Sequence, residues 1–217
     1  MNKEHGKEIY LLLEFMLFFL GVPLFLFLES DLVHPSVVLF PFMLIVFTML
    51  HFLHGFKWHE LWYFRVRRSD FLRQIAIVGI VSLLMISWVY FFDRKNLFNL
   101  PRENWKAWLM IVLFYPVFSA YTQEVIFRTF IFKRYSRLFK NESFTIITSA
   151  CVFSFVHLFY SHPVSMILTF ILGIYLGWIY LKTKSVLFAA ILHGLMGIAV
   201  FSIGLGQYFW LDINKWM

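Results

Sequence analysis

The chain has 217 residues, of which 61% are hydrophobic, 22% aromatic and only 14% charged. Soluble domains average about 45–50% apolar and about 25% charged residues, so this composition excludes an ordinary soluble domain and predicts a polytopic membrane protein. The net charge of +7 comes from basic residues in short loops between apolar runs, which argues against nucleic-acid binding. The single cysteine, Cys151, excludes an internal disulfide framework and a multi-cysteine metal site.

Repeated apolar runs, each near the roughly 20 residues that cross a bilayer, predict an all-α bundle with about seven membrane-spanning helices. We expect the spans at residues 9–28, 36–53, 74–92, 105–137, 144–160, 164–181 and 186–205. The first run ends at Glu29 without a small-residue cleavage site, so we expect a retained helix that Pro23 kinks. An eighth helix, or a re-entrant segment near Pro116, would change the position of the C-terminal tail but not the core of the bundle.

The connections suggest three parts of the chain. Residues 1–104 hold three spans and the segment Lys57–Arg68, whose mixed aromatic and basic residues predict an amphipathic helix in the membrane interface. Residues 105–206 form a core of four spans, and residues 207–217 form an interfacial tail. Lys and Arg in alternate connections number thirteen on one side and five on the other, with Arg128 within the membrane. The positive-inside rule therefore predicts a multi-pass protein of the cell membrane with a cytoplasmic N-terminus and an outer C-terminus.

The most informative stretch is Tyr121-Thr-Gln-Glu-Val-Ile-Phe-Arg128, where an acid and a base lie within strongly apolar sequence. Glu124 and Arg128 are four residues apart, so on a helix they share one face. Ionisable groups within the membrane are costly and normally face a partner or a wet cavity, which makes this pair a candidate functional site.

Two later spans each contain one histidine, His157 and His193, and no other ionisable group at that depth. Alone, each is more typical of a hydrogen-bonded packing residue than of a catalyst, but two histidines with a Glu–Arg pair favour a site. A carboxylate and one histidine can deprotonate a water, while a second histidine donates to the developing oxyanion. This chemistry is hydrolysis of a peptide bond without a covalent intermediate.

The order of these motifs resembles that of the CPBP family, which includes the CAAX prenyl proteases and the bacteriocin-processing and immunity (Abi) proteins. The matching residues are Gln123-Glu-Val-Ile-Phe-Arg128, Phe153-Ser-Phe-Val-His157 and His193-Gly-Leu-Met-Gly197. The resemblance covers roughly residues 105–200. It implies an intramembrane endopeptidase, without metal or organic cofactor, that acts on a membrane-anchored or lipid-modified substrate among membrane lipids.

The chain departs from the family pattern at two positions. The resemblance implies a glutamate at position 123 and an asparagine at position 197, but the chain has Gln123 and Gly197. Because Gln123 cannot accept a proton, Glu124 and His157 are expected to activate the water, while His193 polarises the carbonyl group. Arg128 and Gln123 would orient Glu124 or the substrate, with Phe153 and Gly197 as supporting positions. The alternative is a catalytically impaired binding, immunity or chaperone-like protein.

Other interpretations remain open at this point. The histidine set of His51, His54 and His59 could suggest membrane metal ligands, although histidines at the end of a span are the simpler explanation. A zinc site of Glu124, His157 and His193 is chemically possible. A transporter would show inverted repeats, and the sequence has none. Gly173 and Gly177 are spaced as in helices that pack closely.

Overall fold

The computed structural model describes residues 3–29 and 35–209, and within these ranges the chain is entirely helical apart from its turns and connections. The α-helices are α1 (Lys3–Met16), α2 (Val22–Leu28), α3 (Pro35–His51), α4 (Arg68–Phe92), α5 (Asn99–Glu103), α6 (Trp105–Phe114), α7 (Thr122–Glu124), α8 (Ile131–Arg134), α9 (Glu142–Val156), α10 (Pro163–Thr183) and α11 (Val186–Ile203). Short 3₁₀ turns cover Trp58–Leu61, Arg94–Asn96, His157–Tyr160 and Leu205–Phe209.

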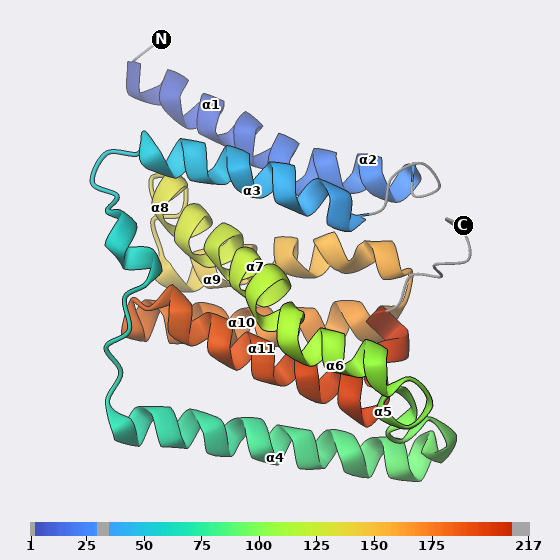
Figure 1. Ribbon diagram of the computed structural model, residues 1–217. Helices are drawn as coiled ribbons and strands as arrows, with labels where there is room; N and C mark the ends of the chain where they lie inside the picture. Colours follow the sequence, from blue (N-terminus) through green and yellow to red (C-terminus); the bar gives the residue numbers. More distant parts are fainter. Residues whose placement is uncertain (1–2, 30–34, 210–217) are drawn as a thin grey trace.

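Within residues 3–29 and 35–209, six continuous helical stretches are long and apolar enough to cross a membrane, and α3 is a shorter apolar helix. In Figure 1 these seven elements lie roughly side by side, from α1 and α2 at the top to α4 at the bottom. The all-α fold with about seven spans is therefore confirmed. The stretch from α6 to α8 is continuous over Trp105–Arg134, so Pro116 lies within a span and does not begin a re-entrant segment.

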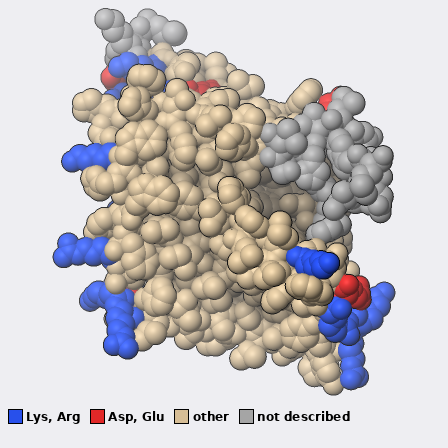
Figure 2. Space-filling model, in the orientation of Figure 1, with Lys and Arg blue, Asp and Glu red and all other residues tan. Residues whose placement is uncertain are grey.

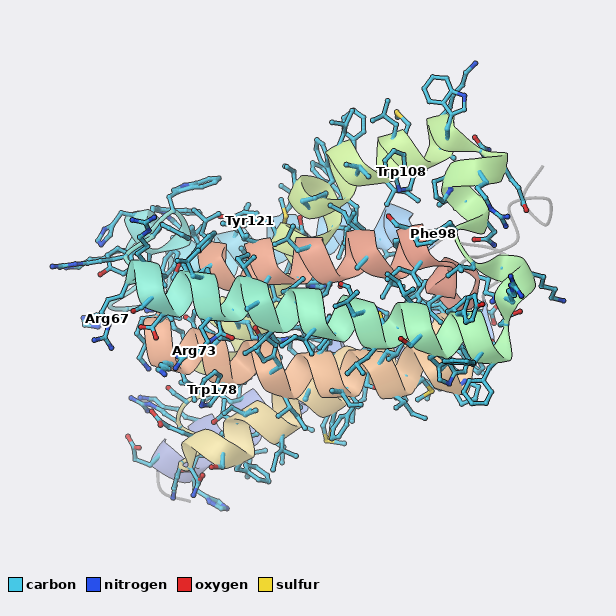
Figure 3. The ribbon with its side chains drawn as sticks, turned by 90° about the horizontal axis from the view of Figure 1, so that it is seen from below. Arg67, Arg73, Phe98, Trp108, Tyr121 and Trp178 are labelled. Carbon is cyan, nitrogen blue, oxygen red and sulfur yellow. The ribbon has the colours of Figure 1, made fainter. Side chains whose placement is uncertain are left out.

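The outer surface of the molecule has the distribution of charge expected of a membrane protein. Figure 2 shows Lys and Arg side chains gathered at two opposite edges, with a broad band of other residues between them. Figure 3 shows α4 in front of α10 and α11 and running in nearly the same direction, with Arg67 and Arg73 near one end and Phe98 near the other. An uncharged band between two charged edges is the arrangement that a bilayer requires.

The helix α11 is the centre of the bundle. In its most apolar stretch 61% of α11 is buried, against 6% for α4, which lies at the edge. Its N-terminus is capped by Ser185, whose Oγ accepts from the backbone N–H of Phe188 at 3.1 Å. Its C-terminus ends at Gly204, where φ is +117° and a side chain would be strained.

Helices α9 and α10 approach each other at small residues. A Cβ placed on Gly173 would lie 2.9 Å from Cα and Cβ of Ala150, so only glycine allows this contact. Gly177 packs on Ile146 in the same interface. The close packing expected from the Gly-x-x-x-Gly spacing is confirmed.

The span that carries the first motif is not a regular α-helix. It is π-helical over Tyr115–Tyr121 and again over Val125–Phe130. The first of these segments begins beside Pro116, which has no N–H to donate to the preceding turn. Such wide turns are uncommon and occur frequently at functional sites, because they change the direction in which side chains leave the helix.

The predicted amphipathic helix at Lys57–Arg68 is wrong. Within this segment the structure has a single 3₁₀ turn, Trp58–Leu61, followed by extended chain. The reason is tertiary: Tyr121 donates its hydroxyl to the carbonyl of Leu61 at 3.1 Å, and Ser185 donates to that of Tyr63 at 2.6 Å. These carbonyl groups bond to neighbouring helices instead of to a helix of their own. Of the predicted tail, residues 210–217 lie outside the described part of the chain.

Candidate active site

Glu124 lies at the centre of the polar groups inside the bundle. Its Oε1 accepts a hydrogen bond from Nδ1 of His193 on α11 at 2.9 Å, and its Oε2 lies 3.0 Å from Nε of Arg128. Glu124 and Arg128 are both completely buried. The N–H of Arg128 Nε is not aligned with Oε2, so this contact is an ion pair and not a hydrogen bond. Both carboxylate oxygens of Glu124 therefore face cationic or donor groups.

Arg128 also connects α9 to the span Trp105–Arg134, which is called the motif helix below. Its Nη1 donates to Ser149 Oγ at 3.0 Å, and Ser149 Oγ donates to the carbonyl of Phe127 at 2.7 Å. The guanidinium carbon lies 5.2 Å from the centre of the Phe153 ring. Phe153 also contacts both histidines edge-on, with ring centres 4.8 Å from His157 and 5.6 Å from His193. Phe153 thus contacts the guanidinium group of Arg128 and the rings of both histidines.

His157 has one ring nitrogen bound and the other free. Its Nδ1 lies 2.7 Å from the carbonyl oxygen of Phe153, which can only accept, so Nδ1 carries a hydrogen. Neutral His157 then has its lone pair on Nε2, for which the described residues offer no hydrogen-bond partner. A histidine fixed in this tautomer is suited to accept a proton at Nε2.

Gln123 presents an amide oxygen without a partner. Its Nε2 donates to Ser119 Oγ at 2.8 Å, one helical turn earlier. Its Oε1 is buried and has no hydrogen-bond partner among the described residues. A buried unpaired acceptor costs about 1–3 kcal/mol, which favours a bound water or substrate donor at this oxygen.

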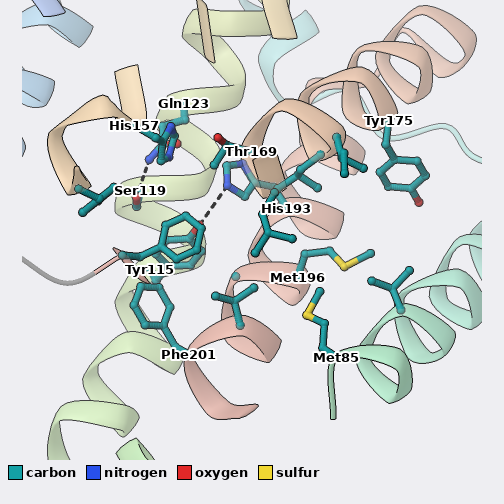
Figure 4. A pocket seen from close by; sticks show the side chains of 18 of the residues that line it. Met85, Tyr115, Ser119, Gln123, His157, Thr169, Tyr175, His193, Met196 and Phe201 are labelled. Atoms are coloured by element: carbon teal, nitrogen blue, oxygen red, sulfur yellow. Dashed lines mark hydrogen bonds between the residues drawn. The ribbon is translucent and has the colours of Figure 1, made fainter. Parts of the chain in front are cut away.

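Gln123 and His157 each line two cavities. The larger, of about 270 Å³, lies among α4, α10, α11 and the motif helix (Figure 4). The second, of about 180 Å³, lies among α2, α3 and the motif helix and is lined mainly by aliphatic and phenylalanine side chains. Four residues line both cavities: Ser119, Gln123, His157 and Tyr160. The polar face formed by Gln123 and His157 is therefore the place where the two cavities meet.

His193 and Gly197 line the larger cavity, together with Tyr115. The Tyr115 hydroxyl lies 3.0 Å from Nε2 of His193 (Figure 4). Its ring occupies the space beside Gly197, because a Cβ added to Gly197 would lie 2.6 Å from the hydroxyl oxygen. His193 is thus bound at both ring nitrogens.

The residues predicted from the sequence do lie in one region, but they form two groups. Glu124, Arg128 and His193 are joined by direct contacts, whereas His157 and Gln123 face the cavities. Glu124 lines neither cavity. Tyr115, Ser119 and Ser149 are site residues that were not predicted from the sequence. Ser119 alone had a sequence signal, because it is four residues before Gln123 and shares its helical face.

The zinc interpretation has no support in this arrangement. Across residues 3–29 and 35–209, no group of three or more His, Cys, Asp or Glu side chains is placed to hold a metal ion. Of the histidines near the second span, His51 accepts a hydrogen bond from Trp58 Nε1 at 3.3 Å, an exposed contact. It lies at the end of α3, as expected of a histidine near the membrane surface.

The fold and the side chains together define the class of this protein, a helical membrane bundle with a buried polar site. Residues 104–199 match the family model described as type II CAAX prenyl endopeptidase Rce1-like. This match includes all three motifs and supports the CPBP and CAAX protease family that they predict. No curated protein and no solved structure matches the chain.

Proposed function

We propose that this protein is an intramembrane endopeptidase that hydrolyses a peptide bond with a water activated by His157. The observation that carries the proposal is the position of His157 where two cavities meet, with Nδ1 bound and Nε2 free. The family match supports the reaction class.

The water is held between two acceptors. It donates one hydrogen to Nε2 of His157 and the other to the unpaired Oε1 of Gln123. Its oxygen attacks the carbonyl carbon, and the departing proton moves to His157. The carbon–nitrogen bond then breaks, His157 returns the proton to the leaving amine, and the products are a carboxylic acid and an amine.

Glu124 has a supporting role in this scheme. Both of its oxygens are bound, it lines neither cavity, and its charge is balanced by Arg128. It accepts a hydrogen bond from Nδ1 of His193 and so fixes the orientation of the ring, with Nε2 toward the Tyr115 hydroxyl. The His193 side of the cavity supplies the oxyanion stabilisation. Glu124 therefore acts through His193, and His157 is the base.

The substrate we propose is a membrane-anchored or lipid-modified peptide. The second cavity, with Phe19, Leu39 and Phe42 in its lining, suits an apolar group that reaches Gln123 and His157 from within the bilayer. The excess of Lys and Arg at the edge that holds the start of α1 supports a cytoplasmic N-terminus in a cell membrane.

A non-hydrolytic membrane protein that binds the same substrates is the second candidate. The observation that favours it is Gln123, since an amide at this position cannot take a proton. The two functions differ in whether a bound peptide is cut.

The experiment is reconstitution of the purified protein in lipid vesicles with membrane-anchored peptides, with and without a prenyl group. Products are analysed by mass spectrometry in water enriched in ¹⁸O, with a strong chelator in parallel. Hydrolysis predicts a new carboxyl group that carries ¹⁸O, with the same yield when the chelator is present. Peptides that bind but stay intact would support the second candidate.

A further inference from the structure

The ring of Tyr115 fills the space beside Gly197 that a side chain at position 197 would need. A Cβ on Gly197 would overlap Cε1 of Tyr115 and would lie 2.6 Å from both its Cζ and its hydroxyl oxygen. Gly197 is on α11, whereas Tyr115 is the first residue of the π-helical segment Tyr115–Tyr121. The glycine and the tyrosine therefore form a complementary pair across two helices.

The Tyr115 hydroxyl is the end of a chain of hydrogen bonds. Glu124 Oε1 accepts from Nδ1 of His193 at 2.9 Å, and Nε2 of His193 lies 3.0 Å from the hydroxyl oxygen. When both imidazole nitrogens carry hydrogen, Nε2 donates to the tyrosine oxygen. The hydroxyl hydrogen is then free to point into the cavity that Tyr115 lines.

We propose that Tyr115 is a catalytic residue: its hydroxyl donates to the carbonyl oxygen of the substrate as that oxygen becomes negative. This inference rests on the proposed hydrolytic function and names the donor that this chain uses. The hydroxyl group takes the place of the side chain that Gly197 lacks. No covalent bond forms to Tyr115, and its hydrogen stays on its oxygen while His193 and Glu124 polarise it.

The location of Tyr115 favours this role over simple packing. Its hydroxyl bonds to the histidine that Glu124 orients, inside the cavity that also contains Gln123 and His157. Tyr175 lines the same cavity but donates its hydroxyl to Oε1 of Gln74 on α4, at 2.8 Å. Tyr175 is therefore a matched control, with the same side chain in the same cavity and a bond directed away from the site.

The test compares Tyr115→Phe and Tyr175→Phe in the full-length protein, reconstituted with a peptide that the wild type cuts. Removal of one oxyanion donor lowers kcat by about 10²–10³-fold, so Tyr115→Phe should show a loss of this size with KM little changed. Tyr175→Phe should keep the wild-type kcat. Circular dichroism and thermal unfolding of both variants show whether each remains folded.

A second pair of variants tests whether a hydrogen-bond donor at position 197 can replace the hydroxyl of Tyr115. Tyr115→Ala removes the ring and the donor, and Tyr115→Ala with Gly197→Asn restores an amide donor in the vacated space. The double variant should cut faster than Tyr115→Ala. Unchanged kcat in a folded Tyr115→Phe, or no gain in a folded double variant, would overturn the assignment while leaving the hydrolytic function in place. A wild type that cuts none of the peptides contradicts both.

Discussion

Oε1 of Glu124 accepts a hydrogen bond from Nδ1 of His193 at 2.9 Å, and this bond ties the motif helix to α11 in the centre of the bundle. With Arg128 on its other oxygen, Glu124 is fully buried and has a partner on each side. The contacts of Glu124 also stabilise the fold, because a charged side chain buried within the membrane is costly unless its partner is present.

Removal of one member of the Glu124–Arg128 pair should destabilise the fold. Glu124→Gln leaves a buried guanidinium without its counter-charge, and such losses cost about 3–5 kcal/mol. The measurement is the free energy of unfolding in detergent. Asp70→Asn is the control, because the contacts of Asp70 with Arg67 and Arg73 are exposed pairs and contribute about 0–1 kcal/mol.

A double variant tests whether the charges of Glu124 and Arg128 determine the free energy of unfolding. Glu124→Gln with Arg128→Met removes both charges, so it should be more stable than Glu124→Gln alone. A double variant less stable than the single one would show that the hydrogen bond of Arg128 to Ser149, and not the ion pair, determines the stability.

The amide at position 123 should limit kcat, and it should have little effect on the binding of substrate. Gln123→Glu places a second proton acceptor beside His157, so kcat should rise, and a general base typically contributes about 10²–10⁴-fold. Gln123→Leu removes both Oε1 and the bond to Ser119, so it should lower kcat. Steady-state cleavage in vesicles measures both variants. A fall in kcat in a folded Gln123→Glu would contradict the proposed position of the water.

The first helix is held to the motif helix by a second buried cluster. Oε1 of Glu14 accepts from Nε of Arg134 at 3.0 Å and from the Tyr135 hydroxyl at 3.0 Å, and its Oε2 accepts from Nη2 of Arg134 at 2.8 Å. Hydrogen bonds to charged groups contribute about 1.5–3 kcal/mol, so Glu14→Ala should lower the free energy of unfolding by at least one such bond. Cleavage per folded molecule should stay unchanged. The exposed Glu4→Ala, 3.9 Å from Arg137, is the control.

At the opposite edge, Asp93 gives a pH-dependent contact. Its carboxylate accepts from Asn96 Nδ2 at 2.8 Å and from Gln207 Nε2 at 2.8 Å, and these bonds, chiefly that of Asn96, lower its pKa. A lowered pKa means that the stabilisation is complete above the unfolded value of about 3.9 and is lost as the pH falls through the folded value. The thermal unfolding temperature of the wild type should therefore approach that of Asp93→Asn as the pH falls below about 4. A constant difference at all pH values would contradict this assignment.

The fold and the participants in the site could be predicted from the sequence where the signal is local. Apolar length predicts the spans, and an acid, an arginine and two histidines inside apolar runs indicate a site, because burial of such groups needs a reason. The four-residue spacing of Glu124 and Arg128 predicts their ion pair, which is confirmed at 3.0 Å.

What the sequence could not provide are the contacts between distant segments. Glu14 and Arg134 are 120 residues apart, so no local pattern in the sequence relates them. Gly197 indicates a missing side chain, but only the packed bundle shows that Tyr115 fills the space. The irregular π-helical turns around Glu124 determine which motif side chains reach the cavities, and spacing along a regular helix does not contain this information.

The central claim is that His157 activates the water, and the most direct measurement is the single-turnover cleavage rate of His157→Gln in lipid vesicles. His54→Gln, an exposed histidine beyond α3, is the matched control. A folded His157→Gln should cut about 10²–10⁴-fold more slowly than the wild type, while His54→Gln cuts at the wild-type rate. Cleavage by folded His157→Gln at the wild-type rate would contradict the account.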